Sequence, residues 1–184
     1  MKRSILLLSL ILCFTYSFSQ KYWEESNIST SFDAAKKYKV AILPIVSNDA
    51  ETSGEENLLK LAYNEINIQL TGVANFQVVT KQKMDETVNL YRFGGGPVNS
   101  ANYTDIAKAL GVDLLVYCEL SRDMGIVKKK EISTIMAYLQ IFDAKSDFTA
   151  VYTAKARSIN PLSKQSEVEL AVTKSLAKLV DKIK

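Results

Sequence analysis

The sequence predicts an α/β fold in which one mixed sheet packs against helices. Three observations lead to this class: strand and helix patterns alternate up to about residue 121, two alternating runs then flank a turn, and an amphipathic helix ends the chain. The expected order of elements is β-α-β-α-α-β-β-β-α, with an antiparallel hairpin near the C-terminus.

The first half of the chain carries strand and helix patterns in turn. Residues 40–43 form a continuous apolar run, which is typical of a strand covered on both faces, and Pro44 predicts an interruption of its hydrogen-bond ladder. Apolar residues then recur at helical spacing over about 55–71, and a glycine follows where a helix C-cap is expected. A short strand at 76–80 and a second helix at 81–93 complete this half.

A third helix and a buried strand come next. Residues 102–111 have helical periodicity, and Gly111 is placed to end the helix. Residues 113–121 are mostly apolar and predict a buried strand. Cys118 lies within this strand and is expected to be a buried free thiol, since a free cysteine packs like a small hydrophobe.

The C-terminal part has a different pattern. Residues 131–142 and 148–159 alternate on either side of a turn cluster at 143–147, which predicts an antiparallel hairpin. A final helix, capped by Ser163 or Ser166, is expected to lie on the sheet. Its apolar stripe consists of Val168, Val172, Leu176, Leu179 and Ile183.

The N-terminus has the layout of a secretory signal peptide over residues 1–19. Two basic residues precede an apolar run at 5–14, which is too short to span a bilayer core of about 30 Å. Small residues then favour cleavage before Gln20. The rival route is lipidation of Cys13, which would leave the protein associated with the outer membrane. The bulky Leu12 directly before this cysteine disfavours that processing.

Two further segments follow the signal peptide. Residues 20–37 are polar, with scattered aromatics and no sustained period, which predicts a leader with one helical turn. Trp23 is there either a packing anchor or an exposed contact. Residues 38–184 suit a single domain.

Composition excludes several function classes. The signal peptide holds two of the 23 basic residues, so the mature chain carries 21 basic against 20 acidic groups and has no strong field to recruit nucleic acid. The chain has no histidine, which excludes Ser-His-Asp and Cys-His catalysis and histidine ligation of metals. The mature chain contains no second long apolar segment, so no transmembrane helix is expected in it.

The glycine run Gly94, Gly95 and Gly96 raises the question of a phosphate-binding loop. Such a loop lies between a strand and the N-terminus of a helix. Here the glycines follow a predicted helix, a proline comes next, and the motif GxGxxG is absent. We therefore interpret this segment as a helix stop followed by an exposed loop, and no nucleotide or other cofactor is expected.

Three stretches resemble one family of envelope proteins. They are YKVAILPIVSND (38–49), NFQVVTKQKMDETVN (75–89) and DIAKALGVDLLVYCELS (105–121). They are similar to the curli-assembly (CsgG-type) family, the LpoB activators of penicillin-binding proteins and the N-terminal domain of TolB. The third stretch matches the family pattern A-x-x-L-G-A-D-x-L/V-V through Ala107, Leu110, Gly111, Val112, Asp113, Leu115 and Val116. Asp143 and Ala144 match the family's hairpin corner.

The resemblance covers about residues 38–184 and implies the fold more than an activity. The chain departs from the pattern at two glycine positions. Glu119 replaces the glycine after the strand motif, and the turn glycine is replaced near Asp147.

We expect a non-enzymatic, exported protein of the periplasm or cell envelope that binds an envelope protein. The oligomeric state is not determined by the sequence, and a homo-oligomer is one alternative. The alternative function is a periplasmic module that binds a small ligand or a peptidoglycan fragment. Loops at 48–54 and 93–102 are the expected contact regions, because loops on a rigid scaffold commonly carry binding residues. The contact residues expected are Asn48, Asp49, Glu51, Phe93, Gly94, Gly95, Gly96 and Asn99. No metal site is expected.

Overall fold

A computed structural model of the 184-residue chain describes residues 22–48, 56–91, 98, 100–127, 130–158 and 164–183, without the side chains of residues 22, 23 and 123–133. The elements are β1 (Tyr22–Ile28), β2 (Tyr38–Ile42), β3 (Val46–Ser47), α3 (Glu56–Thr71), β4 (Phe76–Val78), α4 (Lys81–Asn89), the short 3-10 helix η1 (Ser100–Asn102), α5 (Tyr103–Leu110), β5 (Leu114–Val127), β6 (Lys130–Asp143), β7 (Thr149–Ser158) and α6 (Lys164–Ile183).

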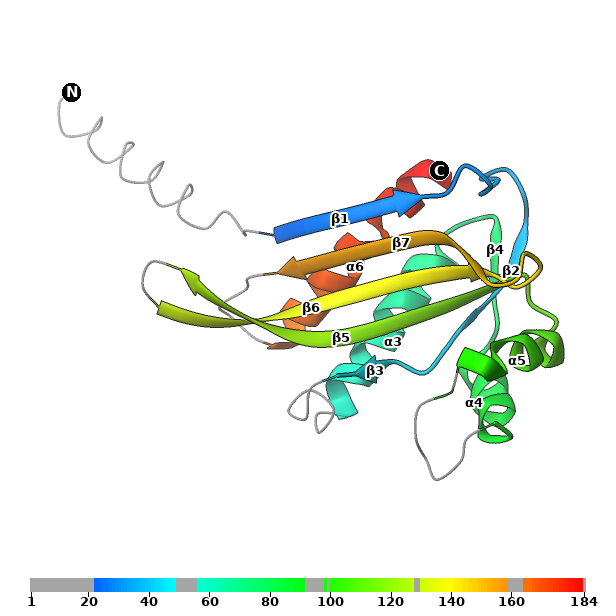
Figure 1. Ribbon diagram of the computed structural model, residues 1–184, viewed down its shortest axis with the longest axis horizontal. Coiled ribbons are helices and arrows are strands. Elements are labelled where there is room, and N and C mark those ends of the chain that lie inside the picture. Colours follow the sequence, from blue (N-terminus) through cyan, green and yellow to red (C-terminus); the bar gives the residue numbers. More distant parts are fainter. Residues whose placement is uncertain are drawn as a thin grey trace.

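The strands form one mixed sheet, which confirms the predicted α/β class. Its order is β1-β7-β6-β5-β2-β4, and the short β3 also pairs with β5 (Figure 1). β2 runs parallel to β4 and β5, whereas β5, β6, β7 and β1 are antiparallel neighbours. The sheet is thus parallel where helices connect the strands and antiparallel where hairpins do.

Pro44 interrupts the first buried strand as predicted. β2 ends at Ile42, and the same segment returns to the ladder as β3 at Val46, so that both pieces pair with β5. Between them, the Leu43 N–H still donates to the Val116 carbonyl at 2.9 Å. A proline has no N–H to donate, so the ladder opens at this position and resumes beyond it.

Helices α3 and α6 cover one face of the sheet (Figure 1). The predicted stripe of α6 is confirmed: Val168, Val172, Leu176 and Leu179 are fully buried, and Ile183 is partly buried against the same core. Polar contacts fix the position of this layer, since the Tyr152 hydroxyl donates to the Ser175 carbonyl at 2.6 Å.

The opposite face is only partly covered. Helices α4 and α5 pack on the end of the sheet near β2 and β4, where they bury Ala41, Leu43 and Leu115 (Figure 1). Apart from Tyr103 of α5, which contacts Phe142 near the end of β6, no described helix packs on this face over β6, β7 and β1. These strands therefore present one face to the helices and leave the other open, as antiparallel sheets commonly do.

Several predicted boundaries differ from the structure. The second helix ends at Asn89 and not at residue 93, and the strand expected to end at 121 continues to Val127. α6 begins at Lys164, so Ser166 lies inside its first turn and is not the cap, while Ser163 falls outside the described residues.

The helical turn expected within residues 20–37 is wrong. Residues 22–28 form β1, an edge strand that pairs with β7 along its whole length, from Tyr22 opposite Ser158 to Ile28 opposite Tyr152. Its backbone hydrogen bonds come from a strand some 130 residues away, so local periodicity carried little sign of it. The side chain of Trp23 lies outside those described.

Candidate functional site

A groove opens on the uncovered face of the sheet, where β3, β5 and β6 meet the beginning of α5. Its volume is about 460 Å³. The lining residues are Val46, Ser47, Asn48, Val98, Ser100, Tyr103, Tyr117, Glu119, Tyr138, Gln140 and Phe142. All five that come from β5 and β6 are partly buried, so the groove is shallow and open to solvent.

Glu119 supplies the charge of this groove. The Asn48 amide donates a hydrogen bond to its Oε1, and the Tyr117 hydroxyl donates to its Oε2 at 2.8 Å. A carboxylate can accept about four hydrogen bonds, so this one retains acceptor capacity. No cation among the described residues forms an ion pair with Glu119.

The tyrosines beside Glu119 stay protonated at neutral pH. Burial raises the pKa of Tyr117 strongly, and its hydrogen bond to Glu119 adds to the effect. Burial and the charge of Glu119 also raise the pKa of Tyr138, which lies directly across the ladder from Glu119. Both phenols are therefore neutral: the single Tyr117 proton is donated to Glu119, and the Tyr138 hydroxyl can donate a hydrogen bond into the groove.

The open face continues from the groove toward the sheet edge. Tyr138 also lines a second hollow of about 250 Å³ over β7 and β1. There the Lys155 ammonium lies 5.5 Å from the centroid of the Tyr138 ring, within cation–π range. The face thus combines aromatic rings with charged side chains.

The wall of the groove on the α5 side is aromatic and well packed. Tyr103 begins α5, is 9% exposed, and lies 6.0 Å from Phe142 and 6.3 Å from Phe148 between ring centroids. The Asn102 amide donates to the Tyr91 carbonyl at 3.3 Å. This contact joins η1 to the turn that follows α4.

Only one of the predicted contact residues lies within the described chain. Asn48 lines the groove and holds Glu119. The others, Asp49, Glu51, Phe93, Gly94, Gly95, Gly96 and Asn99, lie outside the described residues. Asn48, Val98 and Ser100 belong to the two loops expected to bind a partner, and they line the same groove. Their role in binding stays a prediction.

Sequence reasoning missed the residues of the groove that come from the strands. Tyr117 and Glu119 fall in a strand interpreted only as buried, and Tyr138 and Gln140 were passed over in favour of the apolar set on the other face. The signal was available: polar and aromatic residues at every second position mark the face of a strand that no helix covers.

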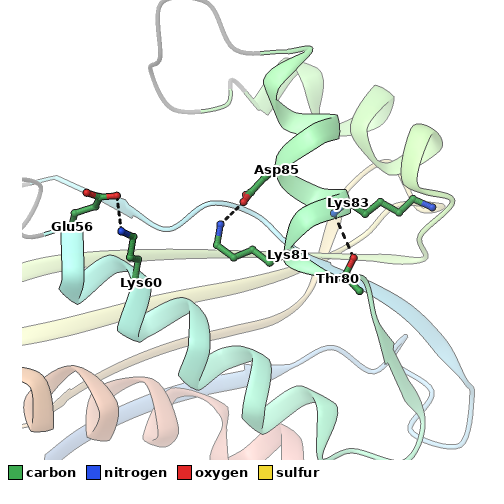
Figure 2. A network of polar contacts seen from close by, with 6 residues as sticks. All are labelled: Glu56, Lys60, Thr80, Lys81, Lys83 and Asp85. Atoms are coloured by element: carbon green, nitrogen blue, oxygen red, sulfur yellow. Dashed lines mark hydrogen bonds and ion pairs between the residues drawn. The ribbon is translucent and has the colours of Figure 1, made fainter.

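A second candidate lies between α3 and α4, and Figure 2 shows its charged residues. Glu56 and Lys60 pair at 3.0 Å on α3, and Lys81 and Asp85 pair on α4. The Tyr63 hydroxyl beneath them is buried without a hydrogen-bond partner in the described chain, and burial and the charge of Asp85 raise its pKa to about 12. Because both cations already have a carboxylate partner, this hollow of about 320 Å³ has no net charge to attract a ligand.

The carboxylates of these helices are solvated. The side chains of Glu56 and Asp85 are 78% and 46% exposed. Within the described part of the chain, no group of three His, Cys, Asp or Glu residues could hold a metal ion. No described helix is both long and apolar enough to cross a membrane.

Comparison with known proteins gives the fold and nothing finer. No family model matches the chain, and no curated protein matches it. Among solved structures, PelC from Paraburkholderia phytofirmans, a dodecamer, matches with a TM-score of 0.53 at 10% identity over 86% of this chain and 97% of that one.

Two other solved structures match less well. Lipoprotein GNA1162 from Neisseria meningitidis has a TM-score of 0.49 at 12% identity, over 78% of this chain and 98% of that one. The LpoB C-terminal domain from Salmonella enterica has a TM-score of 0.41 at 14% identity, over 72% and 87%. The PelC match shows that this chain shares its fold with a protein of very different sequence. The relation to the curli-assembly family stays a prediction.

Proposed function

We propose that this chain is a non-enzymatic, exported protein-binding domain of the cell envelope, and that its partner occupies the groove between β3, α5 and the open face of β5 and β6. The observation that carries the proposal is the groove itself. It is shallow, it lies on a face that no described helix covers beyond its α4–α5 end, and it joins aromatic rings to one held carboxylate. Interfaces are rich in such aromatic residues.

The chemistry of the groove argues against catalysis. Glu119 is the only charged residue among the described residues that line it, and the chain has no histidine to act as a base. A general acid–base mechanism needs a second titratable group with a matched pKa. The raised pKa values of Tyr117 and Tyr138 keep both phenols from acting as bases at neutral pH.

Export is proposed from the first 19 residues. A basic start, an apolar run and small residues before Gln20 match a cleaved secretory signal. Mass spectrometry of the protein recovered from the producing cells tests this. An N-terminus at Gln20 is expected, whereas a lipidated Cys13 would place the protein on a membrane instead.

Site-specific crosslinking tests the binding function. A photoreactive p-benzoylphenylalanine replaces Tyr138 in the groove, or Glu169 on the exposed side of α6 as the control, in cells that express the full sequence. A discrete crosslinked envelope protein from position 138 and not from position 169 is expected. Equal crosslinking from both positions, or none from either, would overturn the proposal.

A second candidate function is a module that binds a small ligand or a peptidoglycan fragment. The volume of the groove lies within the range of small-molecule pockets, and polar groups of Glu119, Gln140 and Asn48 line it. Native mass spectrometry of the purified protein separates the two functions, since a retained small molecule with no crosslinked protein would favour the second.

Self-association is a special case of the same proposal. The PelC structure of similar fold is a dodecamer. Analytical ultracentrifugation of the exported protein measures its oligomeric state, and crosslinking from position 138 between copies of this chain would identify the groove as that interface.

A further inference from the structure

We propose that the groove recognises a lysine or arginine side chain on an extended segment of the partner protein, with Glu119 as the anionic contact. This inference rests on the proposed protein-binding function and names the chemistry of the partner.

The first argument is charge. Of the eleven described residues that line the groove, Glu119 alone is charged. Its carboxylate receives two hydrogen bonds from neutral donors and forms no ion pair with a cation of the described chain. A single negative charge of this kind is complemented by a single cation, because charge-assisted hydrogen bonds to a carboxylate are stronger than neutral ones.

The second argument is the position of the rings around the carboxylate. Tyr138 lies directly across the ladder from Glu119, and Tyr117 precedes it by two residues on the same face. The Lys155 ammonium already lies 5.5 Å from the Tyr138 centroid, so this ring takes a cation in the folded protein. On the α5 wall, the partly buried Phe142, which packs against the Tyr103 ring, offers apolar surface to the aliphatic stem of a lysine or arginine.

The third argument is preorganisation. Asn48 on the loop after β3 and Tyr117 on β5 hold one carboxylate oxygen each, so the charged group has a fixed orientation before a partner arrives. Binding then costs little side-chain ordering at Glu119. A partner segment that follows the open face can place its backbone along β5 and β6 and its basic side chain over the carboxylate.

Peptide titration tests the charge. The probe is acetyl-Gly-Ala-Lys-Ala-Gly-amide, added to the exported protein and followed by NMR shifts of the backbone amides of residues 117–119 and 138–140. We expect the probe to move these resonances and Glu119→Gln to weaken its binding at least about tenfold. Glu169→Gln removes the same charge from the exposed side of α6 and should leave binding unchanged.

A second probe and a second variant serve as controls for the charge. A probe with norleucine in place of lysine should bind wild type no better than the lysine probe binds E119Q. Gln140→Lys places a cation in the groove without altering Glu119 and should also reduce binding about tenfold. Thermal unfolding of each variant verifies that it is folded.

Several outcomes would overturn the inference. They are no binding of the lysine probe, equal binding by E119Q, equal binding of the norleucine probe, and tighter binding of a glucosamine oligomer, which would point to a cationic sugar. If E119Q still crosslinks the same envelope protein from position 138, the basic contact is wrong while the binding function stands. If no protein crosslinks at all, the binding function itself fails.

Discussion

The Tyr117 hydroxyl donates a 2.8 Å hydrogen bond to Oε2 of Glu119, two residues further along β5. Side chains at i and i+2 of a strand project from the same face, so the pair needs no tertiary contact to form. Asn48, more than seventy residues earlier in the chain, donates to the other oxygen and joins the β3 segment to the pair. A local strand pattern and a long-range contact thus hold the one charge found among the described residues of the groove.

The variant Tyr117→Phe tests this pair. Loss of the donor should lower the free energy of unfolding by about 1 kcal/mol, because the partner is charged but partly solvated. Urea denaturation measures the change. Tyr138→Phe is the matched control, since its hydroxyl has no hydrogen-bond partner among the described residues beside its ring contact with Lys155. It should change stability by less than about 0.5 kcal/mol. Equal effects of the two variants would contradict the assignment.

Gly111 ends α5 with a positive φ of 61°, a left-handed conformation that side chains disfavour. Gly111→Ala should therefore lower stability by about 1 kcal/mol. The added Cβ would meet only the Lys39 Nζ at 3.6 Å, an ordinary contact, so the cost comes from the backbone.

Gly72→Ala is the control for that experiment. Gly72 also follows a helix, but its φ is not positive and its added Cβ would meet two carbonyl oxygens at 3.5 Å. Alanine there should be neutral or slightly stabilising, because it restricts the unfolded chain. Thermal melts of both variants measure the difference, and equal destabilisation would show that the conformation at 111 is not the cause.

Most of the fold was readable from the sequence because most elements rest on local patterns. The apolar run at 40–43 and the stripe of α6 predicted buried elements, and Pro44 predicted the break that separates β2 from β3. β1 could not be predicted from the sequence, because this polar edge strand is formed by its ladder with β7 and has little periodicity of its own.

The candidate site was less predictable than the fold, for a geometric reason. The groove exists because β3, β6 and α5 converge on β5, and strand order is not contained in local periodicity. The turn after β6 illustrates the same limit. The glycine that the family pattern places near Asp147 is absent, and Asp147 and Phe148 take positive φ values of 50° and 54° in its place. Phe148 holds that conformation next to the Tyr103 ring, a contact between distant segments.

Asp113 joins β2 to the turn between β6 and β7. It accepts a 2.9 Å hydrogen bond from the Lys39 backbone N–H and pairs with Lys145 at 2.5 Å. Burial alone raises the pKa of this carboxyl, but the hydrogen bonds from Lys145 and the Lys39 N–H outweigh burial, so its pKa is lowered. The stability that it contributes is therefore present above the usual aspartate pKa of about 4 and is lost as the pH falls through the lower folded-state value.

Asp113→Asn should consequently be less stable than wild type at pH 7, by about 1 kcal/mol, and the gap should narrow below pH 4. Urea denaturation at pH 7 and pH 3 measures both values. Asp181→Asn, on the exposed side of α6, removes the same charge and should show no such pH dependence. If the stability difference between wild type and Asp113→Asn does not change with pH, Asp113 stabilises the fold through hydrogen bonding and not through its charge.

Cys118 is fully buried under α3 and α6, and burial, with a smaller contribution from the charge of Glu119, raises its pKa to about 12. In the unfolded chain the thiol ionises from about pH 8.5. The folded state holds the proton to higher pH, so the stability that this group contributes is complete below pH 8.5 and is lost as the pH rises toward 12.

Two measurements follow from that difference in pKa. Native protein should react slowly with iodoacetamide at pH 8.5 and rapidly in urea, because the thiolate is the reactive form. Between pH 8 and pH 10, Cys118→Val should lose about 2 kcal/mol less stability than wild type. The variant should still lose some stability at alkaline pH. Burial also raises the pKa values of Tyr63 and Tyr152 to about 12, and these shifts act in the same direction. Rapid labelling of the native protein, or identical alkaline slopes for wild type and variant, would show that water reaches Cys118 from the open face or through the helix layer.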